Sequence, residues 1–313
     1  MENFLISLGC VTPMFITICV GLILRFSKVV PPEAFRHLSA ITFHALLPCI
    51  VFNNIYTADL SIAVQPRLLV FLIGFLFVWF TLNYTFLRKR IPDHRRCGTF
   101  IQVAYRSNVG IVGLSLAQNM MGADGLATAA IAVSLIVPFY NVMAVYTLET
   151  CRGETPKLGH TIIQVIRNPM IIACILGFAV QLAGIRLPAP VVRAVGNLAT
   201  SGSVTALMAL GGSFVFSTLK GNLRLILIGC VYRLILAPLA AIAAAVAFGF
   251  RGDFLGIVLI CNAAPLSTAT YSMAIAYDSD HELTSQLIVC SSLLCSLTLF
   301  LWIFALRQLG LML

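Results

Sequence analysis

Ten apolar runs, separated by short polar connections, dominate the pattern of this chain. A helix needs about 20 predominantly apolar residues to cross a bilayer, and each run is close to that length. Pro48, Pro138 and Pro238 lie inside runs and are expected to kink or break their helices. We therefore predict an all-α polytopic membrane protein with ten transmembrane helices. The runs cover residues 4–24, 34–56, 67–87, 98–121, 125–148, 168–186, 190–218, 224–248, 254–276 and 284–306.

The composition agrees with a membrane protein. Of 313 residues, 60% are hydrophobic and 10% are charged, whereas soluble domains are about 45–50% apolar and about 25% charged. The ten cysteines form no CxxC pair and no Cys/His spacing typical of a metal site, so we predict neither a metal nor a cofactor. The sequence contains no motif of the common hydrolases or nucleotide-binding enzymes, and we predict no enzymatic activity.

Basic residues outnumber acidic ones, 20 to 11, but most lie between the apolar runs. In that position they set membrane topology, so they are no argument for nucleic-acid binding. The odd-numbered connections hold 13 lysines and arginines and the opposite side holds 5. By the positive-inside rule, the odd-numbered connections face the cytoplasm. We expect a multi-pass protein of the inner (plasma) membrane with both termini on the non-cytoplasmic side.

The longest connection divides the chain into two halves of five runs each. Because each half has an odd number of spans, the second half starts on the opposite side of the membrane, and a repeat would be inverted. The openings of the second and seventh runs resemble each other (31–36 and 188–193), and Asn108 and Asn262 lie 154 positions apart. We predict a first five-helix repeat over 1–148, a cytoplasmic connection over 149–167 and an inverted five-helix repeat over 168–313.

The run 98–121 carries polar and helix-weakening residues at membrane depth. Arg106 and Asn108 are costly there, and Gly110 and Gly113 each weaken a helix by about 1 kcal/mol relative to alanine. A helix that breaks inside the bilayer must turn its freed backbone toward protein or toward a water-filled cavity. We therefore expect a broken fourth helix with a substrate site at the break.

A matching break is expected in the ninth helix, where Asn262 lies three residues before Pro265. Proline removes a backbone donor and leaves one carbonyl without its helical partner. We expect helices four and nine to cross at their breaks, with Asn108, Gly110, Asn262 and Pro265 forming the site. In the alternative interpretation, the two asparagines tie helices together by hydrogen bonds and Gly113 only allows close packing.

Arg106 and Arg233 lie well inside runs, whereas all eleven acidic residues lie at run ends or in connections. Buried charges need a partner, and the carboxylate of a substrate would supply one. Alternatively, either arginine extends toward the cytoplasmic face or caps helix carbonyls. The lack of acids within the runs speaks against proton or sodium coupling through a carboxylate, and His44 is expected to be a packed, hydrogen-bonded histidine.

The segment from Asn108 to Leu116, N-V-G-I-V-G-L-S-L, resembles the N-[TV]-G-[FI]-[IV]-G-L-P-L signature of the auxin efflux carrier family. Ser115 stands where the family has proline, so the break is expected to depend on Gly110 and Gly113. Arg106 has no counterpart in the family pattern and is expected to mark a particular substrate. Arg233 begins a common eighth-helix pattern, which favours a structural role. Further matches, in order, are Leu47-Pro48-Cys49-Ile50-Val51-Phe52, Arg167-Asn168-Pro169, Leu210-Gly211-Gly212, and Ala264-Pro265 with Tyr277 and Asp280.

The resemblance implies two inverted five-helix repeats, with a scaffold and a transport subdomain each drawn from both repeats. It also implies crossed helices four and nine and a homodimer. Prokaryotic members are associated with small organic anions such as malonate and malate. We thus expect a secondary transporter of a mono- or dicarboxylate that works by alternating access. One alternative is a sodium-coupled organic-anion carrier of the bile-acid type, and another is a membrane receptor or assembly subunit that transports nothing.

Overall fold

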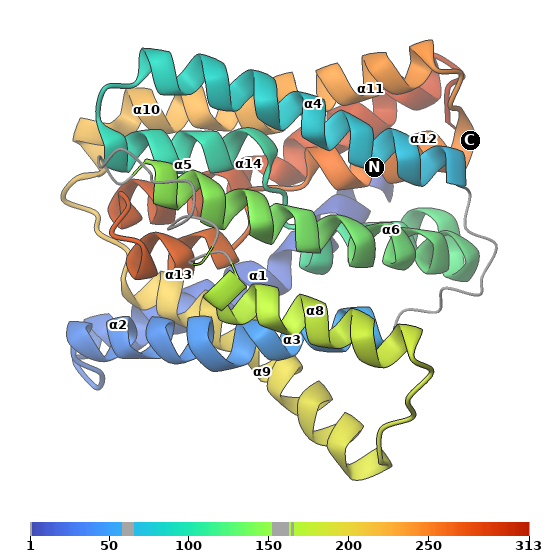
Figure 1. Ribbon diagram of the computed structural model, residues 1–313. Coiled ribbons are helices and arrows are strands. Elements are labelled where there is room, and N and C mark those ends of the chain that lie inside the picture. The colour runs from blue at the N-terminus through green and yellow to red at the C-terminus, as the bar shows by residue number, and fades with distance from the viewer. Residues whose placement is uncertain (1, 58–65, 152–162, 164–165, 313) are drawn as a thin grey trace.

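The computed structural model describes residues 2–57, 66–151, 163 and 166–312, and these fold almost wholly into helices (Figure 1). Within these ranges the only β structure is one isolated antiparallel bridge. Most of the predicted connection 149–167 lies outside the described residues. With one-turn π-helices labelled η, the elements are α1 (Glu2–Phe26), α2 (Pro32–Ile41), η1 (Thr42–Leu46), α3 (Leu47–Tyr56), α4 (Pro66–Arg90), α5 (His94–Tyr105), η2 (Val109–Gly113), α6 (Leu114–Thr150), α8 (Pro169–Leu182), α9 (Ala189–Gly212), α10 (Leu219–Val231), η3 (Tyr232–Leu236), α11 (Ala237–Ala247), α12 (Gly252–Ala263), α13 (Ala269–Ala276) and α14 (His281–Gln308).

The all-helical class predicted from the sequence is confirmed, and each of the ten apolar runs contains helix. By length and composition, five helical segments among the described residues can cross a membrane. Three further apolar helices are shorter. The five are Pro32–Tyr56, Pro66–Arg90, Thr128–Thr150, Leu219–Ala247 and His281–Gln308; the shorter three are Thr12–Phe26, Pro169–Leu182 and Gly252–Ala263.

The prolines inside the runs interrupt the helices less than expected. Pro48 and Pro238 each follow a π-helical turn, η1 or η3, in which a backbone N–H donates to the carbonyl five residues earlier. This wider turn relieves the clash between a proline ring and the preceding turn, so helix continues on both sides. Pro138 lies within α6 without ending it. The non-helical residue of α6 is Gly122, whose φ of 66° and ψ of −155° suit glycine.

The helices pack in two groups. The first group contains α1, α2, α3, α8 and α9; the second contains α4, α5, α6 and α10 to α14. In Figure 1, α2, α3, α8 and α9 lie below, whereas α4, α10, α11 and α12 lie above. The helices α1 and α14, α3 and α6, and α2 and α13 also contact one another across the boundary between the groups. Helices from both halves of the sequence are therefore present in each group.

Small residues bring α1 and α9 together within the first group. A Cβ atom added at Gly211 would lie 2.0 Å from the carbonyl oxygen of Ile18, and one added at Gly21 would lie 2.2 Å from that of Met208. Glycine at such positions lets two helix backbones approach closely, which gives strong van der Waals packing between membrane helices.

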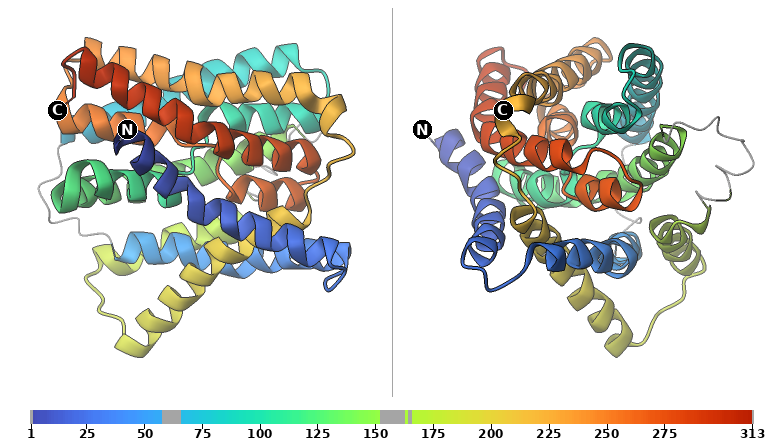
Figure 2. Two further views of the ribbon diagram at one scale, coloured as in Figure 1. Left: turned by 180° about the vertical axis from the view of Figure 1, so that it is seen from behind. Right: turned by 90° about the vertical axis from the view of Figure 1, so that its left-hand side faces the viewer.

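The connections lie alternately at the two ends of the molecule. Connections 27–31, 91–93, 213–218 and 277–280 lie at one end, on the left in Figure 1, which we call the basic end because Arg88 to Arg96 surround the second of them. Connections 183–188 and 248–251 lie at the opposite end. The start of α1 and the end of α14 both point to that opposite end, as Figure 2 shows. This alternation agrees with the predicted order of the connections and leaves the orientation in the membrane a prediction.

Candidate functional site

Two interrupted helices meet in the centre of the molecule. The helix α5 ends at Tyr105, and Arg106 has an extended backbone with φ −86° and ψ 101°. The following residue, Ser107, forms an antiparallel bridge with Leu266, and the N–H of Asn108 donates to the carbonyl of Pro265 over 2.8 Å. The backbone groups freed by the interruption therefore bond to a second interrupted segment.

The second interruption lies between α12 and α13. The helix α12 ends at Ala263, Ala264 is extended, and α13 begins at Ala269. The N–H of Ser267 donates to the carbonyl of Arg106 over 3.3 Å, which completes the pairing of the two segments. We call residues 106–108 and 264–268 the crossover. The residue that pairs with Ser107 across the crossover is Leu266, and Asn262 lies before the crossover, within α12.

The glycines expected to break the fourth helix lie after the break. Gly110 and Gly113 belong to η2, a helical turn, whereas the non-helical residues of the break are 106–108. A Cβ at Gly110 would meet nothing within 4 Å, but one at Gly113 would lie 3.0 Å from the side chain of Ile260 on α12. This close contact favours the alternative interpretation of Gly113, in which the glycine allows two helices to pack closely. Ser115 lies in α6, and the structure does not describe its side chain.

Arg106 is 2% exposed, and its guanidinium contacts only neutral groups among the described residues. It donates to Oε1 of Gln102 over 3.1 Å, to Oδ1 of Asn141 over 2.9 Å and to Sδ of Met273 at 2.6 Å. No ion pair involves this guanidinium in the described part of the chain. A cation at this depth therefore has hydrogen-bond acceptors but no counter-charge.

A cavity of about 270 Å³ lies beside the crossover, between the two groups of helices. Arg106, Asn108 and Gly110 line it from the crossover side, and so do Ser267 and Thr268. Among the described residues, the side-chain amide of Asn108, which is 5% exposed, donates to Sδ of Met14 over 3.6 Å, a weak acceptor.

Five further polar residues line the cavity, those of α3 and α9 from the wall opposite the crossover, and the sequence analysis did not single them out. Asn53 and Asn54 come from α3, Asn141 from α6, and Thr200 and Ser203 from α9. All five are polar residues inside apolar runs, which is the signal that could have identified them. The Nδ2 of Asn141 is buried without a hydrogen-bond partner among the described residues. The cavity is thus rich in neutral hydrogen-bonding groups and contains one cation, Arg106, among its lining residues.

Asn262 lies apart from this cavity. Its side-chain Nδ2 donates to the carbonyl of Val258 over 3.0 Å within its own helix, and it is absent from the cavity lining. Arg233 is 1% exposed and donates from Nη2 to the backbone carbonyl of Asn262. This contact caps the C-terminal end of α12, as the alternative interpretation of Arg233 expected. Pro265 contributes its carbonyl to the pairing of the crossover and does not line the cavity.

His44 also lies away from the cavity. Its Nδ1 is 3.1 Å from the carbonyl of Ala40, and its ring packs edge-on against Phe43. The side chain is exposed, so His44 is hydrogen-bonded but less enclosed than expected. No group of three or more metal-ligating side chains occurs among the residues that the structure describes.

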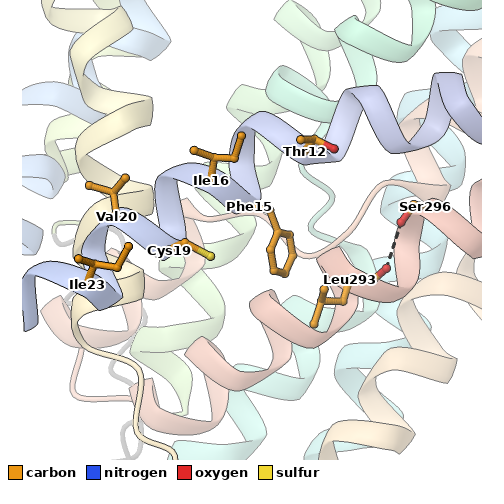
Figure 3. A pocket seen from close by; sticks show the side chains of 8 residues that line it. All are labelled: Thr12, Phe15, Ile16, Cys19, Val20, Ile23, Leu293 and Ser296. Atoms are coloured by element: carbon orange, nitrogen blue, oxygen red, sulfur yellow. Dashed lines mark hydrogen bonds between the residues drawn. The ribbon is translucent and has the colours of Figure 1, made fainter. Parts of the chain in front are cut away.

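A larger hollow between α1 and α14, about 440 Å³, has a different character (Figure 3). Its lining is almost wholly apolar, and the hydroxyl of Ser296 donates to the carbonyl of Leu293 in its own helix over 3.1 Å. Ile16 and Ile23 in this lining are 60% and 63% exposed. A hollow of this composition on the surface of apolar helices suits lipid chains, whereas a polar substrate needs the cavity beside the crossover.

Comparison with known proteins finds a matching family and relatives that are named as transporters. The sequence model of a family described as "Membrane transport protein" matches residues 6–303. The chain is 22% identical over 302 residues to an "Uncharacterized transporter" of Methanothermobacter thermautotrophicus, covering 96% of this chain and 98% of that protein. It is also 22% identical over 308 residues to "Uncharacterized transporter MJ1031" of Methanocaldococcus jannaschii, covering 95% of this chain and 98% of the relative.

Proposed function

Since the chain belongs to the membrane transport protein family, the family of the auxin efflux carriers, we propose that it carries a small organic anion, a mono- or dicarboxylate, across the membrane by alternating access. The cavity beside the crossover is the proposed substrate site. The observation that carries this proposal is the buried guanidinium of Arg106, which lines the cavity and has no counter-charge among the described residues.

Two helix N-termini at the cavity also favour an anion. Residues 108–110 begin the helical segment that continues into α6, and residues 267–269 lead into α13; all of them line the cavity. The N-terminus of a helix presents free N–H groups and a partial positive charge of about half an elementary charge. A carboxylate in the cavity would accept hydrogen bonds there and would pair with Arg106, whose planar fork matches its two oxygens.

The size of the cavity supports a small substrate. Its volume of about 270 Å³ lies below the range of about 300–1,000 Å³ that is typical of sites for drug-sized ligands. The neutral groups of Asn53, Thr200 and Ser203 on the opposite wall could hydrogen-bond a hydroxyl group or a second carboxylate. A short organic acid with polar groups at both ends therefore suits the cavity better than a bulky aromatic acid.

The division into two groups of helices suggests how access alternates. The cavity lies between them, with α3, α8 and α9 on one side and the crossover on the other. We assign the scaffold to α1, α2, α3, α8 and α9 and the transport subdomain to the second group.

Inverted repeats are supported by the starts of elements: His94 and Gly252, which begin α5 and α12, are 158 positions apart, and Pro32 and Ala189, which begin α2 and α9, are 157 apart. A homodimer in the inner membrane, with both termini outside, remains our prediction.

Counterflow in proteoliposomes tests this proposal. Vesicles preloaded with one of several small mono- or dicarboxylates should accumulate the same labelled acid faster than protein-free vesicles. Arg106→Gln should weaken substrate binding by about 2–5 kcal/mol, the cost of removing one partner of a buried charge pair. Arg106→Lys should recover only part of the binding because lysine lacks the bidentate fork.

The outcomes separate the alternatives. Binding of a carboxylate without any flux would identify a receptor, and flux that requires sodium would identify the sodium-coupled carrier. If Arg106→Gln binds every tested carboxylate as well as the wild-type protein does, Arg106 does not act as the counter-charge.

A further inference from the structure

A second polar cavity, about 410 Å³, lies at the basic end of the molecule. Its lining shares no residue with the cavity beside the crossover. Arg25 of α1 and Arg36 of α2 line it from the first group of helices, together with the C-terminal end of α9. Arg95 of α5 lines it from the second group, together with α13 and the start of α14. The cavity therefore lies across the boundary between the two groups, at the basic end.

The arginines of this cavity differ in how far their charges are compensated. Arg25 donates from Nη1 to the carbonyls of Gly212 and Phe214, at 3.2 and 2.6 Å, and so caps the end of α9. Arg95 forms an ion pair with Asp278. Among the described residues, no carboxylate oxygen lies within 4.0 Å of Arg36. Arg36, whose side chain is exposed, is thus the guanidinium at this cavity for which the described residues provide no ion-pair partner.

The remaining charges at the cavity leave an excess of positive potential. Three arginines line it against two carboxylates, Asp278 and Glu282, and Asp278 is already paired with Arg95. The first residues of α2 and α14 also lie in the lining, and helix N-termini favour anions. With Arg95 paired to Asp278 and Arg25 bonded to the end of α9, Arg36 contributes the charge that an anion in the cavity would neutralise.

We propose that this basic-end cavity binds a phosphate group, held by Arg36 with Arg25 and Arg95. Arginine is the residue best suited to phosphate because its fork donates two parallel hydrogen bonds to two oxygens. Because Arg36 and Arg95 belong to different groups of helices, a bound phosphate links the two groups. This inference rests on the proposed function in one respect: if the two groups move during transport, a phosphate that links them would oppose that movement. Free phosphate and the head group of an acidic phospholipid present the same chemistry to these arginines.

Thermal unfolding of the detergent-purified protein tests the site, with inorganic phosphate as the probe at constant ionic strength. Binding to the folded state raises the unfolding temperature in a saturable way. Arg36→Gln should raise the half-saturating phosphate concentration by roughly tenfold, the effect of one lost charge-assisted contact. Glu282→Gln should lower it because a negative charge leaves the lining. Arg224→Gln is the matched control, an exposed arginine of α10 that lines neither cavity, and should behave as wild type.

Two further measurements make the outcome decisive. If the bound phosphate belongs to a lipid head group, replacing phosphatidylcholine by an acidic phospholipid in nanodiscs should stabilise the wild-type protein more than Arg36→Gln. If the ligand is the free ion, inorganic phosphate in detergent should stabilise the wild type more than Arg36→Gln, and the lipid exchange should not. Arg106→Gln should keep the phosphate response, which separates this site from the proposed substrate site. The proposal is wrong if wild type and Arg36→Gln respond equally to both probes, or if Arg106→Gln abolishes the response.

Discussion

Replacing Gln102 by glutamate tests the role of Arg106 without touching the cavity wall. Gln102 is fully buried, its Oε1 accepts from Nη1 of Arg106 over 3.1 Å, and it does not line the cavity. Its Nε2 has no partner among the described residues, so a carboxylate in its place loses no donor bond. Gln102→Glu would place a permanent anion behind Arg106, where it competes with the charge of the substrate.

The distance gives the size of the effect. Two opposite unit charges 3.1 Å apart attract each other by about 5 kcal/mol at an effective dielectric constant of about 20. Burying the new carboxylate costs several kcal/mol. Because this cost and the attraction to Arg106 are of similar size and opposite sign, the free energy of unfolding should change little. Substrate binding, in contrast, should weaken by about 2–5 kcal/mol, because Arg106 no longer offers an unpaired charge. That range corresponds to an increase in Kd of about 30-fold to a few thousand-fold.

The assay is carboxylate binding by thermal shift, followed by counterflow with whichever acid binds wild type. Gln102→Met is the matched control: it removes the amide at similar volume, adds no charge and should keep most of the binding. A Gln102→Glu variant that folds and binds the acid with wild-type affinity would refute the reasoning. The charge of Arg106 would then not be what holds the substrate.

Three further predictions concern other parts of the structure. Asn108→Ala should lower flux in proteoliposomes by about tenfold or more, the cost of one lost hydrogen bond to a charged group, whereas Asn262→Ala should have a smaller effect because its amide bonds to its own helix. Gly211→Ala should lower the unfolding temperature, since its Cβ would lie 2.0 Å from a carbonyl oxygen of α1 and overpacking costs about 1–3 kcal/mol. The control is Gly110→Ala, because a Cβ atom at Gly110 would have no neighbouring atom within 4 Å. A cysteine introduced near Asp93 should react with a membrane-impermeant reagent only from the cytoplasmic side, and labelling from the other side would reverse the predicted orientation.

The positions of the helices followed from the sequence because apolar length is a local property. The run 284–306 became α14 (His281–Gln308), and the run 67–87 became α4 (Pro66–Arg90). The break in the fourth helix was located in the right run but assigned to Gly110 and Gly113. In the structure, it lies at residues 106–108, because their backbone groups bond to residues 265–267. No local propensity reveals a hydrogen bond between segments so distant in sequence.

The cavity was harder to predict than the crossover. Asn108 and Arg106 stood out as polar residues in an apolar run, but Asn262 stood out for the same reason and lies elsewhere. Which polar side chains share a cavity depends on which helix faces meet, and that is decided by packing such as the close approach of α1 and α9. Thr200 and Ser203 could be assigned to the cavity only after α9 was placed beside α3.

The two buried arginines both lie well inside apolar runs of the sequence, but they lie near different ends of the broken helices and have different surroundings. The C-terminal end of a helix carries a partial negative charge. Arg233 donates from Nη2 to the carbonyl of Asn262 at the end of α12, while its Nε and Nη1 are buried without a partner among the described residues. Arg106 follows the end of α5, but its guanidinium bonds to side chains of Gln102, Asn141 and Met273 and faces a cavity lined by two helix N-termini. A neutral substrate would leave that positive region without a counter-charge, whereas a carboxylate would stabilise it. A substitution behind Arg106, such as Gln102→Glu, should therefore change substrate binding more than the free energy of unfolding.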